Sequence, residues 1–292
     1  MDDTDVLAAA FEEHRAHLRG VAYRLLGSMP DADDAVQEAW LRLTTVDPGE
    51  VENLGGWLTT VVARVALNTL RSRRRHPEQP MLPNWPDPVD PAVPEDEAIM
   101  ADSVGLALIV VLDTLTPAER LAFVLHDLFA MPFTEVGAAL GRSPEAARQL
   151  ASRGRRRVRG APRPDRAADL ARQREVATAF LAASRGGNLS ALVAVLDDDV
   201  TLTADAFATP TGQPERRQGA QAVSRGALAA STRAGYSQLA LVDGEVGIVF
   251  APGGQLRVVL KLTVSPERKI TVMDIIGDPD RLRRLRLAVL PE

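Results

Sequence analysis

Arginine is the residue type with the clearest chemistry in this sequence, and it is concentrated toward the end of a predicted helix over residues 143–159. A guanidinium group can form two parallel hydrogen bonds to a phosphate or to the edge of a guanine. Arginines at a helix C-terminus also offset the helix dipole, but this explains only a few of them. The cluster therefore predicts a polyanion-binding surface: Arg153, Arg155, Arg156, Arg157 and Arg159.

The residues that precede this cluster predict a helix-turn-helix. A short helix spans 133–140, Gly141 turns the chain, and Ser143-Pro144 caps and starts the next helix. In this motif the start of the second helix meets base edges in the major groove, while later basic residues hold phosphates. We therefore expect DNA contacts from the exposed polar residues of the second helix: Ser143, Glu145, Arg148, Gln149, Arg153, Arg156 and Arg157.

A second basic row lies on a predicted helix over residues 56–75. Thr60, Arg64, Asn68 and Arg71 recur at helical steps opposite an apolar stripe, and further arginines, Arg74 among them, follow. A solvated charged face is the usual explanation for such a row. Two basic helices on separate bundles instead suggest a protein that spans two DNA sites.

The elements that position these rows are predicted to form a multidomain chain. Three helices at the N-terminus form one all-α bundle, and the helix-turn-helix belongs to a second all-α domain. Between them, seven prolines interleaved with acidic residues exclude a helix and predict an extended tether. Beyond residue 164, two helices and alternating segments predict an α+β domain with a curved antiparallel sheet. The expected boundaries are 1–76, 77–97 for the tether, 98–161, 165–282, and a tail at 283–292.

Composition narrows the class of protein. The chain of 292 residues has no cysteine, which excludes disulfides, thiolate nucleophiles and cysteine zinc sites and suits a reducing cytoplasm. Its first residues are acidic and no apolar run reaches membrane-spanning length, so we expect a cytoplasmic protein without membrane contact. A net charge of −5 does not argue against DNA binding, because the basic residues are segregated from the acidic ones.

Three segments resemble one family. Residues 31–42 (DADDAVQEAWLR) look like region 2 of the sigma-70 family, and residues 57–74 are similar to the promoter-melting helix of that region. Residues 115–120 (LTPAER) through 146–153 (AARQLASR) look like region 4. Regions 2 and 4 without further domains between them are typical of the extracytoplasmic-function (ECF) class. The third domain resembles the SnoaL-like cone fold that a subset of this class carries.

The resemblance implies roles for particular residues. An acidic face of region 2 docks on a coiled coil of core RNA polymerase, and its matches are Asp33, Asp34, Gln37 and Glu38. Thr60, Arg64 and Asn68 match the face that meets the −10 element of promoter DNA, where bases leave the stack, and Arg71 and Arg74 extend it. The family's residues that contact the −35 element of the promoter are matched in this chain by Arg148, Gln149 and Arg153.

The third domain is expected to regulate these regions in place of a separate anti-sigma factor. Relatives carry short motifs in the tether and in the cone domain, and this chain keeps parts of them. The candidate regulatory contacts are Leu82, Pro83, Asp205, Asp278, Pro279 and Asp280. A small ligand could occupy the cone domain, and the free protein is expected to be monomeric.

Two other classes of protein stay open at this point. A cyclase or isomerase would need an acid–base pair, but the third domain has no histidine, and three adjacent aspartates at 197–199 suit a solvated turn. We therefore expect no enzyme activity, no cofactor and no metal. A ligand-sensing helix-turn-helix repressor would explain the basic helix and the third domain, but not the match to region 2. A repressor binds DNA alone, whereas a sigma factor acts within the polymerase holoenzyme.

Overall fold

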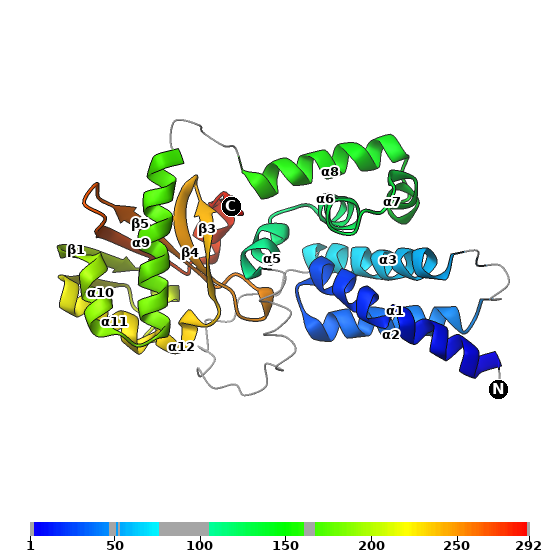
Figure 1. Ribbon diagram of the computed structural model, residues 1–292, viewed down its shortest axis with the longest axis horizontal. Coiled ribbons are helices and arrows are strands. Elements are labelled where there is room, and N and C mark those ends of the chain that lie inside the picture. Colours follow the sequence, from blue (N-terminus) through cyan, green and yellow to red (C-terminus); the bar gives the residue numbers. More distant parts are fainter. Residues whose placement is uncertain (1–2, 47–50, 52, 76–104, 161–166, 291–292) are drawn as a thin grey trace. The chain divides into compact units, whose positions relative to one another are not determined.

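The computed structural model describes residues 3–46, 51, 53–75, 105–160 and 167–290 (Figure 1). The chain divides into two compact units, which are described separately. One contains residues 1–78 and 112–156, and the other contains residues 79–111 and 157–292. The proline tether at 77–97, including Leu82 and Pro83, lies outside the described residues.

The first unit begins with three helices, as predicted: α1 (Asp3–Leu26), α2 (Met29–Leu43) and α3 (Leu54–Arg75). Gly27 ends α1 with a φ of 74°, a left-handed conformation that glycine adopts without strain. The Ser28 side chain then caps α2 by accepting from the backbone N–H of Asp31 at 3.5 Å. Large apolar side chains from all three helices are fully buried, including Leu18, Leu43 and Leu58.

The second helical segment follows the predicted pattern closely. Its helices are α5 (Leu106–Asp113), α6 (Pro117–Phe123), the π-helix η2 (Val124–Leu128), α7 (Phe133–Leu140) and α8 (Pro144–Arg159). Thr116 and Glu119 form the expected capping box at the start of α6. Gly141 ends α7 in the left-handed conformation, with a φ of 65°. This turn sets the angle between α7 and α8.

The two helical segments were expected as separate bundles, but residues 112–156 of the second segment pack on the first three helices in this unit. Helix α3 contacts α6 and α7, and α1 contacts η2. Sequence periodicity identifies the apolar stripe of each helix, but not which helix covers it. The packing therefore follows from side chains that meet only in the folded unit.

The second unit contains a seven-stranded sheet of order β2-β1-β6-β5-β4-β3-β7. Its strands are β1 (Leu196–Ala204), β2 (Glu215–Gln218), β3 (Ser237–Val242), β4 (Glu245–Phe250), β5 (Val258–Val264), β6 (Ile270–Ile276) and β7 (Leu287–Ala288). The α+β architecture is confirmed, but the expectation of a wholly antiparallel sheet is wrong, because β1 pairs in parallel with β6. Alternation of side chains marks a strand without giving its direction.

Two of these strands were not predicted. Strand β2 (ERRQ) is polar along its whole length and so lacks the apolar alternation of a half-buried strand. Strand β7 lies in the segment that we expected to be a tail, and it pairs with β3 through Leu287 and Ala288. The sheet therefore continues past residue 282.

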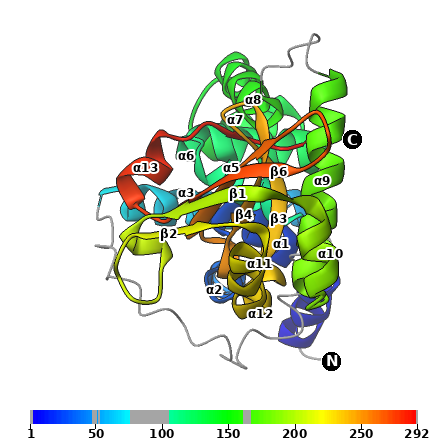
Figure 2. The ribbon, with the colours of Figure 1, turned by 90° about the vertical axis from the view of Figure 1, so that its left-hand side faces the viewer.

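Helices cover one face of this sheet (Figure 2). Helix α9 (Ala167–Arg185) contacts β3, β4 and β5, while α10 (Leu189–Val195) and α11 (Ala220–Ala229) contact β1. Shorter elements are η4 (Ala206–Ala208), α12 (Ser231–Ala234), η5 (Pro252–Gly254) and α13 (Pro279–Arg284). Phe180, Leu192, Val223, Ile248 and Met273 belong to the apolar core between helices and sheet. Across the described part of the chain, no helix is long and apolar enough to cross a membrane.

Candidate nucleic-acid interface

Helix α8 has one buried and one exposed face. Ala147, Leu150, Ala151 and Val158 are buried, and a Cβ added at Gly154 would lie 3.1 Å from the Glu119 carbonyl oxygen, so α8 packs closely on α6. The predicted DNA-contacting residues are on the exposed side: Ser143, Glu145, Arg148, Gln149, Arg153, Arg156 and Arg157. The folded helix therefore presents a row of polar and cationic side chains to solvent.

The start of α8 is held by Ser143. Its Oγ accepts a hydrogen bond from the backbone N–H of Ala146 at 3.3 Å, which satisfies one of the free donors of the first turn. Hydrogen bonds from its own backbone N–H and from Ser143 lower the pKa of Glu145. This glutamate is fully exposed and ionised, so it would discourage phosphate contact at the first turn and could accept from a base amino group.

Arg148 has a defined position over an aromatic ring. Its guanidinium carbon lies 5.2 Å from the centre of Phe133, and Phe133 stacks on His126 at 3.8 Å between ring centroids. A cation over an aromatic face is attracted to the ring and loses part of its rotational freedom. The side chain is therefore partly ordered before any partner arrives.

Two arginines of the cluster form ion pairs inside the unit. Arg155 Nε lies 2.5 Å from Asp127 Oδ1, and this hydrogen bond raises the pKa of Arg155. Arg153 Nε lies 3.4 Å from the buried Glu119 carboxylate. The ion pair of Arg155 thus holds α8 against η2. Arg153 is exposed and also forms an ion pair with α6. The sequence alone did not separate these two from the solvent-facing arginines.

The basic row on α3 is exposed at Arg64, Asn68, Arg71 and Arg74, and half-buried at Thr60. The Thr60 hydroxyl donates to the Gly56 carbonyl at 2.9 Å. Arg64 Nη2 donates to the Ala138 carbonyl of α7 at 2.9 Å. The central arginine of this row is therefore engaged by the helix-turn-helix within the compact unit.

The acidic face of α2 combines charge with exposed apolar surface. Asp33 pairs with Arg19 at 2.5 Å, and Glu38 pairs with Arg42 at 2.9 Å, while Asp34 and Gln37 are exposed. Leu41 lies one turn beyond Gln37 and is 52% exposed. Sequence reasoning did not include Leu41, because a single leucine on a polar face has no distinguishing pattern.

A buried arginine joins α6 to the end of α1. Arg120 is 2% exposed and donates from Nε and Nη2 to the Arg24 carbonyl at 3.3 and 3.2 Å. It also forms an ion pair with Asp113. Phe129 lies beside the same end of α1, under the Arg24 guanidinium at 5.1 Å and edge-on to His17 at 5.2 Å. These contacts hold the two helical segments together.

His17 makes this packing sensitive to pH. Partial burial, and then the nearby charges of His14 and Arg24, lower the pKa of His17 below its ordinary value of 6.5. Because the packed state disfavours the protonated imidazole, its stabilisation is complete above pH 6.5 and falls as the pH drops through the lowered value. We expect the free energy of unfolding of this unit to decrease as the pH falls below 6.5, measured by urea titration. His17→Gln should flatten part of this slope, and an unchanged slope would assign it to other groups.

In the second unit, Asp205 closes a loop. Its carboxylate accepts from the backbone N–H groups of Ala208, Gly277 and Asp278 at 3.0–3.1 Å, and from Arg281 at 3.1 Å. Neighbouring Asp278 caps α13 by accepting from the N–H groups of Asp280 and Arg281, and Pro279 starts that helix. Asp280 pairs with Arg283 on the surface. The predicted regulatory residues that the structure describes thus hold one another within the domain.

The same unit also holds segments on either side of the helix-turn-helix. The backbone N–H of Ala107 donates to Gln238 Oε1 at 3.0 Å, and that of Val289 donates to the Val158 carbonyl at 2.8 Å. A Cβ added at Gly160 would lie 2.9 Å from the Ala288 Cβ, so only glycine allows this approach. The sheet therefore binds the chain just before and just after the helix-turn-helix.

The acidic residues that were weighed for acid–base chemistry in the third domain have local backbone partners. The aspartates at 197–199 were expected in a turn, but they lie in strand β1, where its pairing with β6 is irregular, and Asp197 accepts from the Asp199 backbone N–H at 3.0 Å. The Asp205 carboxylate accepts hydrogen bonds from backbone N–H groups of its loop, including that of Asp278. Among the residues that the structure describes, no group of three His, Asp or Glu side chains could hold a metal ion.

Comparisons with known proteins place the two helical segments in one family. The family model for sigma-70 region 2 matches residues 10–76, and the model for sigma-70 region 4 matches residues 105–158. The chain is 39% identical over 292 residues to the ECF RNA polymerase sigma factor SigJ of Mycobacterium tuberculosis, covering 93% of this chain and 91% of that protein. It is 31% identical over 296 residues to a probable ECF RNA polymerase sigma factor, SigI, of the same species, covering 98% of each.

A solved structure is also similar. The crystal structure of the Mycobacterium tuberculosis extracytoplasmic function sigma factor SigJ matches with 33% sequence identity and a TM-score of 0.42, covering 94% of this chain and 97% of that one.

Proposed function

The chain belongs to the extracytoplasmic-function class of sigma-70 sigma factors, and we propose that α8 reads the −35 element, α3 meets the −10 element and α2 docks on core RNA polymerase. As a sigma factor it is a transcription initiation factor and not an enzyme, and its partners are core RNA polymerase and promoter DNA. It would act in the cytoplasm, where the polymerase is. The surface assignments follow from exposed side chains.

The observation that carries the −35 assignment is the exposed row on α8 after a capped turn. Arg148 and Gln149 lie in its first turns, where a recognition helix meets base edges, and Arg156 and Arg157 follow at positions suited to phosphate. The Phe133 contact holds Arg148 near one orientation, which reduces the entropy lost on binding. A ligand-sensing repressor could use the same helix, but it would have no use for the α2 surface.

Arginine substitutions on α8 separate the two kinds of contact. Arg148→Ala should reduce discrimination between the preferred −35 sequence and a mutated one by about 1–3 kcal/mol, because it removes a base contact. Arg156→Ala should lower affinity on all sequences and reduce the salt slope by about one unit. Both are measured by titrating promoter DNA with holoenzyme at several salt concentrations. Equal losses on every sequence for both variants would mean that α8 reads no bases.

The α2 surface suits a partner with both cationic and apolar side chains. Asp34 and Gln37 supply exposed polar groups, and Leu41 supplies apolar area on the same side of the helix. Leu41→Glu should weaken binding to core RNA polymerase by about tenfold or more, with little change in thermal stability. Leu189→Glu is the matched control, because Leu189 is 43% exposed but lies on the other unit. Similar binding by both variants and the wild type would exclude Leu41 from the interface.

The packed first unit is proposed to be the resting state of the factor. In it, Arg64 bonds to α7 and is not available to a −10 element. The two promoter elements are read at separate places on the DNA, so regions 2 and 4 must part when the holoenzyme binds a promoter. The contacts of Arg120 and Phe129 with α1 therefore compete with promoter binding.

The C-terminal unit is proposed to regulate this opening in place of a separate anti-sigma factor. It binds the chain on both sides of the helix-turn-helix, through Gln238 and through Val289. A domain tethered in this way acts at a high effective concentration. The free protein is proposed to be monomeric, since the regulating contacts are made within one chain.

The deciding experiment is run-off transcription with core RNA polymerase on the upstream region of the gene itself. We expect transcripts only when polymerase and factor are both present, and removal of residues 165–292 should change their amount without abolishing promoter choice. Promoter binding by the factor alone would favour the repressor. Loss of all binding to core polymerase in the shortened chain would contradict the regulatory role of the C-terminal unit.

A further inference from the structure

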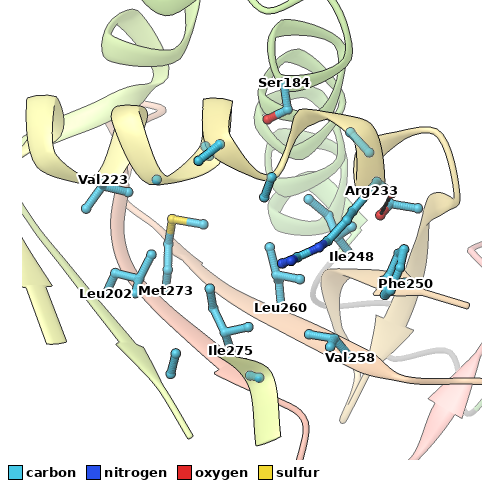
Figure 3. Close-up of a pocket in the computed structure, with 18 of the residues that line it drawn as sticks. Ser184, Leu202, Val223, Arg233, Ile248, Phe250, Val258, Leu260, Met273 and Ile275 are labelled. Carbon is cyan, nitrogen blue, oxygen red and sulfur yellow. Dashed lines mark hydrogen bonds between the residues drawn. The ribbon is translucent and has the colours of Figure 1, made fainter. Parts of the chain in front are cut away.

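A cavity of about 220 Å³ lies in the C-terminal unit, between helices α9, α11 and α12 on one side and strands β1, β4, β5 and β6 on the other (Figure 3). Its lining is mostly apolar and includes Phe180, Ile248, Leu260 and Met273. An engineered apolar cavity of about 150 Å³ stays free of water and admits benzene. This cavity therefore has room for an organic molecule somewhat larger than benzene.

The charged side chains of the lining already have partners in the protein. They belong to Glu215, Arg217 and Arg233. Arg217 Nε lies 2.5 Å from Glu215 Oε1, so these two residues form an ion pair. Arg233, whose side chain extends toward Leu260 (Figure 3), also has an interaction partner. A charged ligand would have to compete with these interactions and give up its hydration in an apolar space. The lining therefore favours an uncharged ligand.

Three hydroxyl groups belong to the lining, and two of them are engaged. Thr209 Oγ1 donates to the Gln213 carbonyl at 2.7 Å, and Ser237 Oγ donates to the Arg233 carbonyl at 3.0 Å. The third belongs to Ser184 of α9, which is 5% exposed, and it has no hydrogen-bond partner among the described residues. Buried hydroxyl groups without a partner are uncommon, because their desolvation is uncompensated. A polar atom of a ligand would satisfy this hydroxyl.

We propose that this cavity binds a small uncharged carbonyl compound with an apolar body. A serine hydroxyl can donate one hydrogen bond, so the carbonyl oxygen would accept from Ser184. The body would extend from α9 toward the side chains of Leu260 and Met273 on the strands. A hydrocarbon would fill the same space but leave the hydroxyl without a partner. An anion would lose its hydration without a free counter-charge in the lining.

The cavity wall is connected to the segment that precedes the helix-turn-helix. Arg185, the residue after Ser184, donates to the Ser237 carbonyl at 2.5 Å. Ser237 begins β3, and its neighbour Gln238 accepts from the Ala107 backbone N–H at 3.0 Å. A ligand that bonds to Ser184 would therefore stabilise the end of α9 and the strand that holds this segment. The consequence for transcription rests on the proposed function, whereas binding itself does not.

Isothermal titration calorimetry on the full chain tests the proposal. The probes are the ketones 1-indanone and 4-phenyl-2-butanone, their hydrocarbon matches indane and butylbenzene, and phenylacetate as an anion of similar size. We expect at least one ketone to bind with saturation and a dissociation constant below about 1 mM. Phenylacetate should bind about tenfold more weakly than that ketone, or not at all.

Variants of the cavity wall assign the hydrogen bond. Ser184→Ala should lower affinity for the ketone about 3- to 10-fold and should not lower affinity for its hydrocarbon match. The same variant should not lower the melting temperature of the free protein, because it removes a buried hydroxyl that has no partner. Ser190→Ala is the matched control, since Ser190 is exposed in the same unit and lies outside the lining. Ala227→Phe should fill the cavity and abolish binding of every probe, while thermal unfolding confirms that each variant folds.

Several results would overturn the proposal. These are a failure of both ketones to saturate, binding of phenylacetate as tight as that of the ketones, and equal losses for ketone and hydrocarbon in Ser184→Ala. A lower melting temperature for Ser184→Ala would also overturn it, because the hydroxyl would then have a partner in the free protein. Run-off transcription with and without the ketone is a separate measurement. Binding without a change in transcript would refute only the link to regulation.

Discussion

Asp205→Ala is expected to lower the free energy of unfolding of the C-terminal unit by about 3–4 kcal/mol. The carboxylate accepts hydrogen bonds from three backbone N–H groups and from Arg281, and its side chain is 16% exposed. Alanine would remove the acceptor of the Gly277 and Asp278 N–H groups in a place that water reaches poorly, whereas Ala208 keeps its bond to the Asp205 carbonyl and Arg281 keeps its bond to Asp274. The approach is also tight, since a Cβ added at Gly277 would lie 2.7 Å from the Ala208 nitrogen. The loop would therefore reorganise as a whole.

Thermal unfolding followed by circular dichroism measures this effect. We expect the melting temperature of the unit to fall by about 10 °C. Asp280→Ala is the matched control, because Asp280 is 70% exposed and its side chain forms a surface pair with Arg283. It should change the melting temperature very little. Equal melting temperatures for the wild type and Asp205→Ala would show that the loop is held by other contacts.

Arg120→Met is expected to destabilise the first unit by about 3 kcal/mol. The substitution keeps most of the apolar stem but removes the donors to the Arg24 carbonyl and the charge that faces Asp113. The carbonyl at the end of α1 would then lose its bond to α6. Because this bond joins the two helical segments, the packed state should open more readily as well as unfold more readily.

Two measurements separate these consequences. Urea titration gives the loss of stability, and energy transfer between dyes on α1 and α8 reports separation of the segments below the unfolding transition. Arg142→Met is the control, since Arg142 is an exposed arginine of the same segment. An Arg120→Met protein that unfolds earlier but shows no earlier separation would mean that Arg120 stabilises region 4 alone. The proposed resting state would then depend on Arg64 and Phe129.

These two residues show where the sequence was informative and where it was not. Asp205 is a candidate from the sequence because it matches part of a family motif. The motif does not indicate which groups donate hydrogen bonds to its carboxylate. Arg120 was part of the segment that resembles region 4, yet nothing in its neighbourhood marked it as buried. Arginine is so often exposed that only the packing of α6 against α1 reveals the exception.

The basic helices show a similar division. Periodicity and capping predicted α3 and α8 and the exposed faces of both, because these signals act within a few residues. They did not show that Arg155 forms an ion pair with Asp127, or that Arg64 donates a hydrogen bond to a carbonyl of α7. Each of those partners is distant in sequence, and the pairing depends on how separate helices pack.

The sequence by itself determined the class of this protein, its helical regions and the α+β domain that follows them. Those features depend on local patterns: the apolar stripe of a helix, the Thr116–Glu119 capping box, the turn at Gly141 and the family segments around them. The tertiary structure alone decided the parallel pairing of β1 with β6, the burial of Arg120 and the cavity beside Arg233. Each of these features depends on contacts between segments far apart in the chain. The free energy of such contacts cannot be inferred from the residues within a single helix or strand.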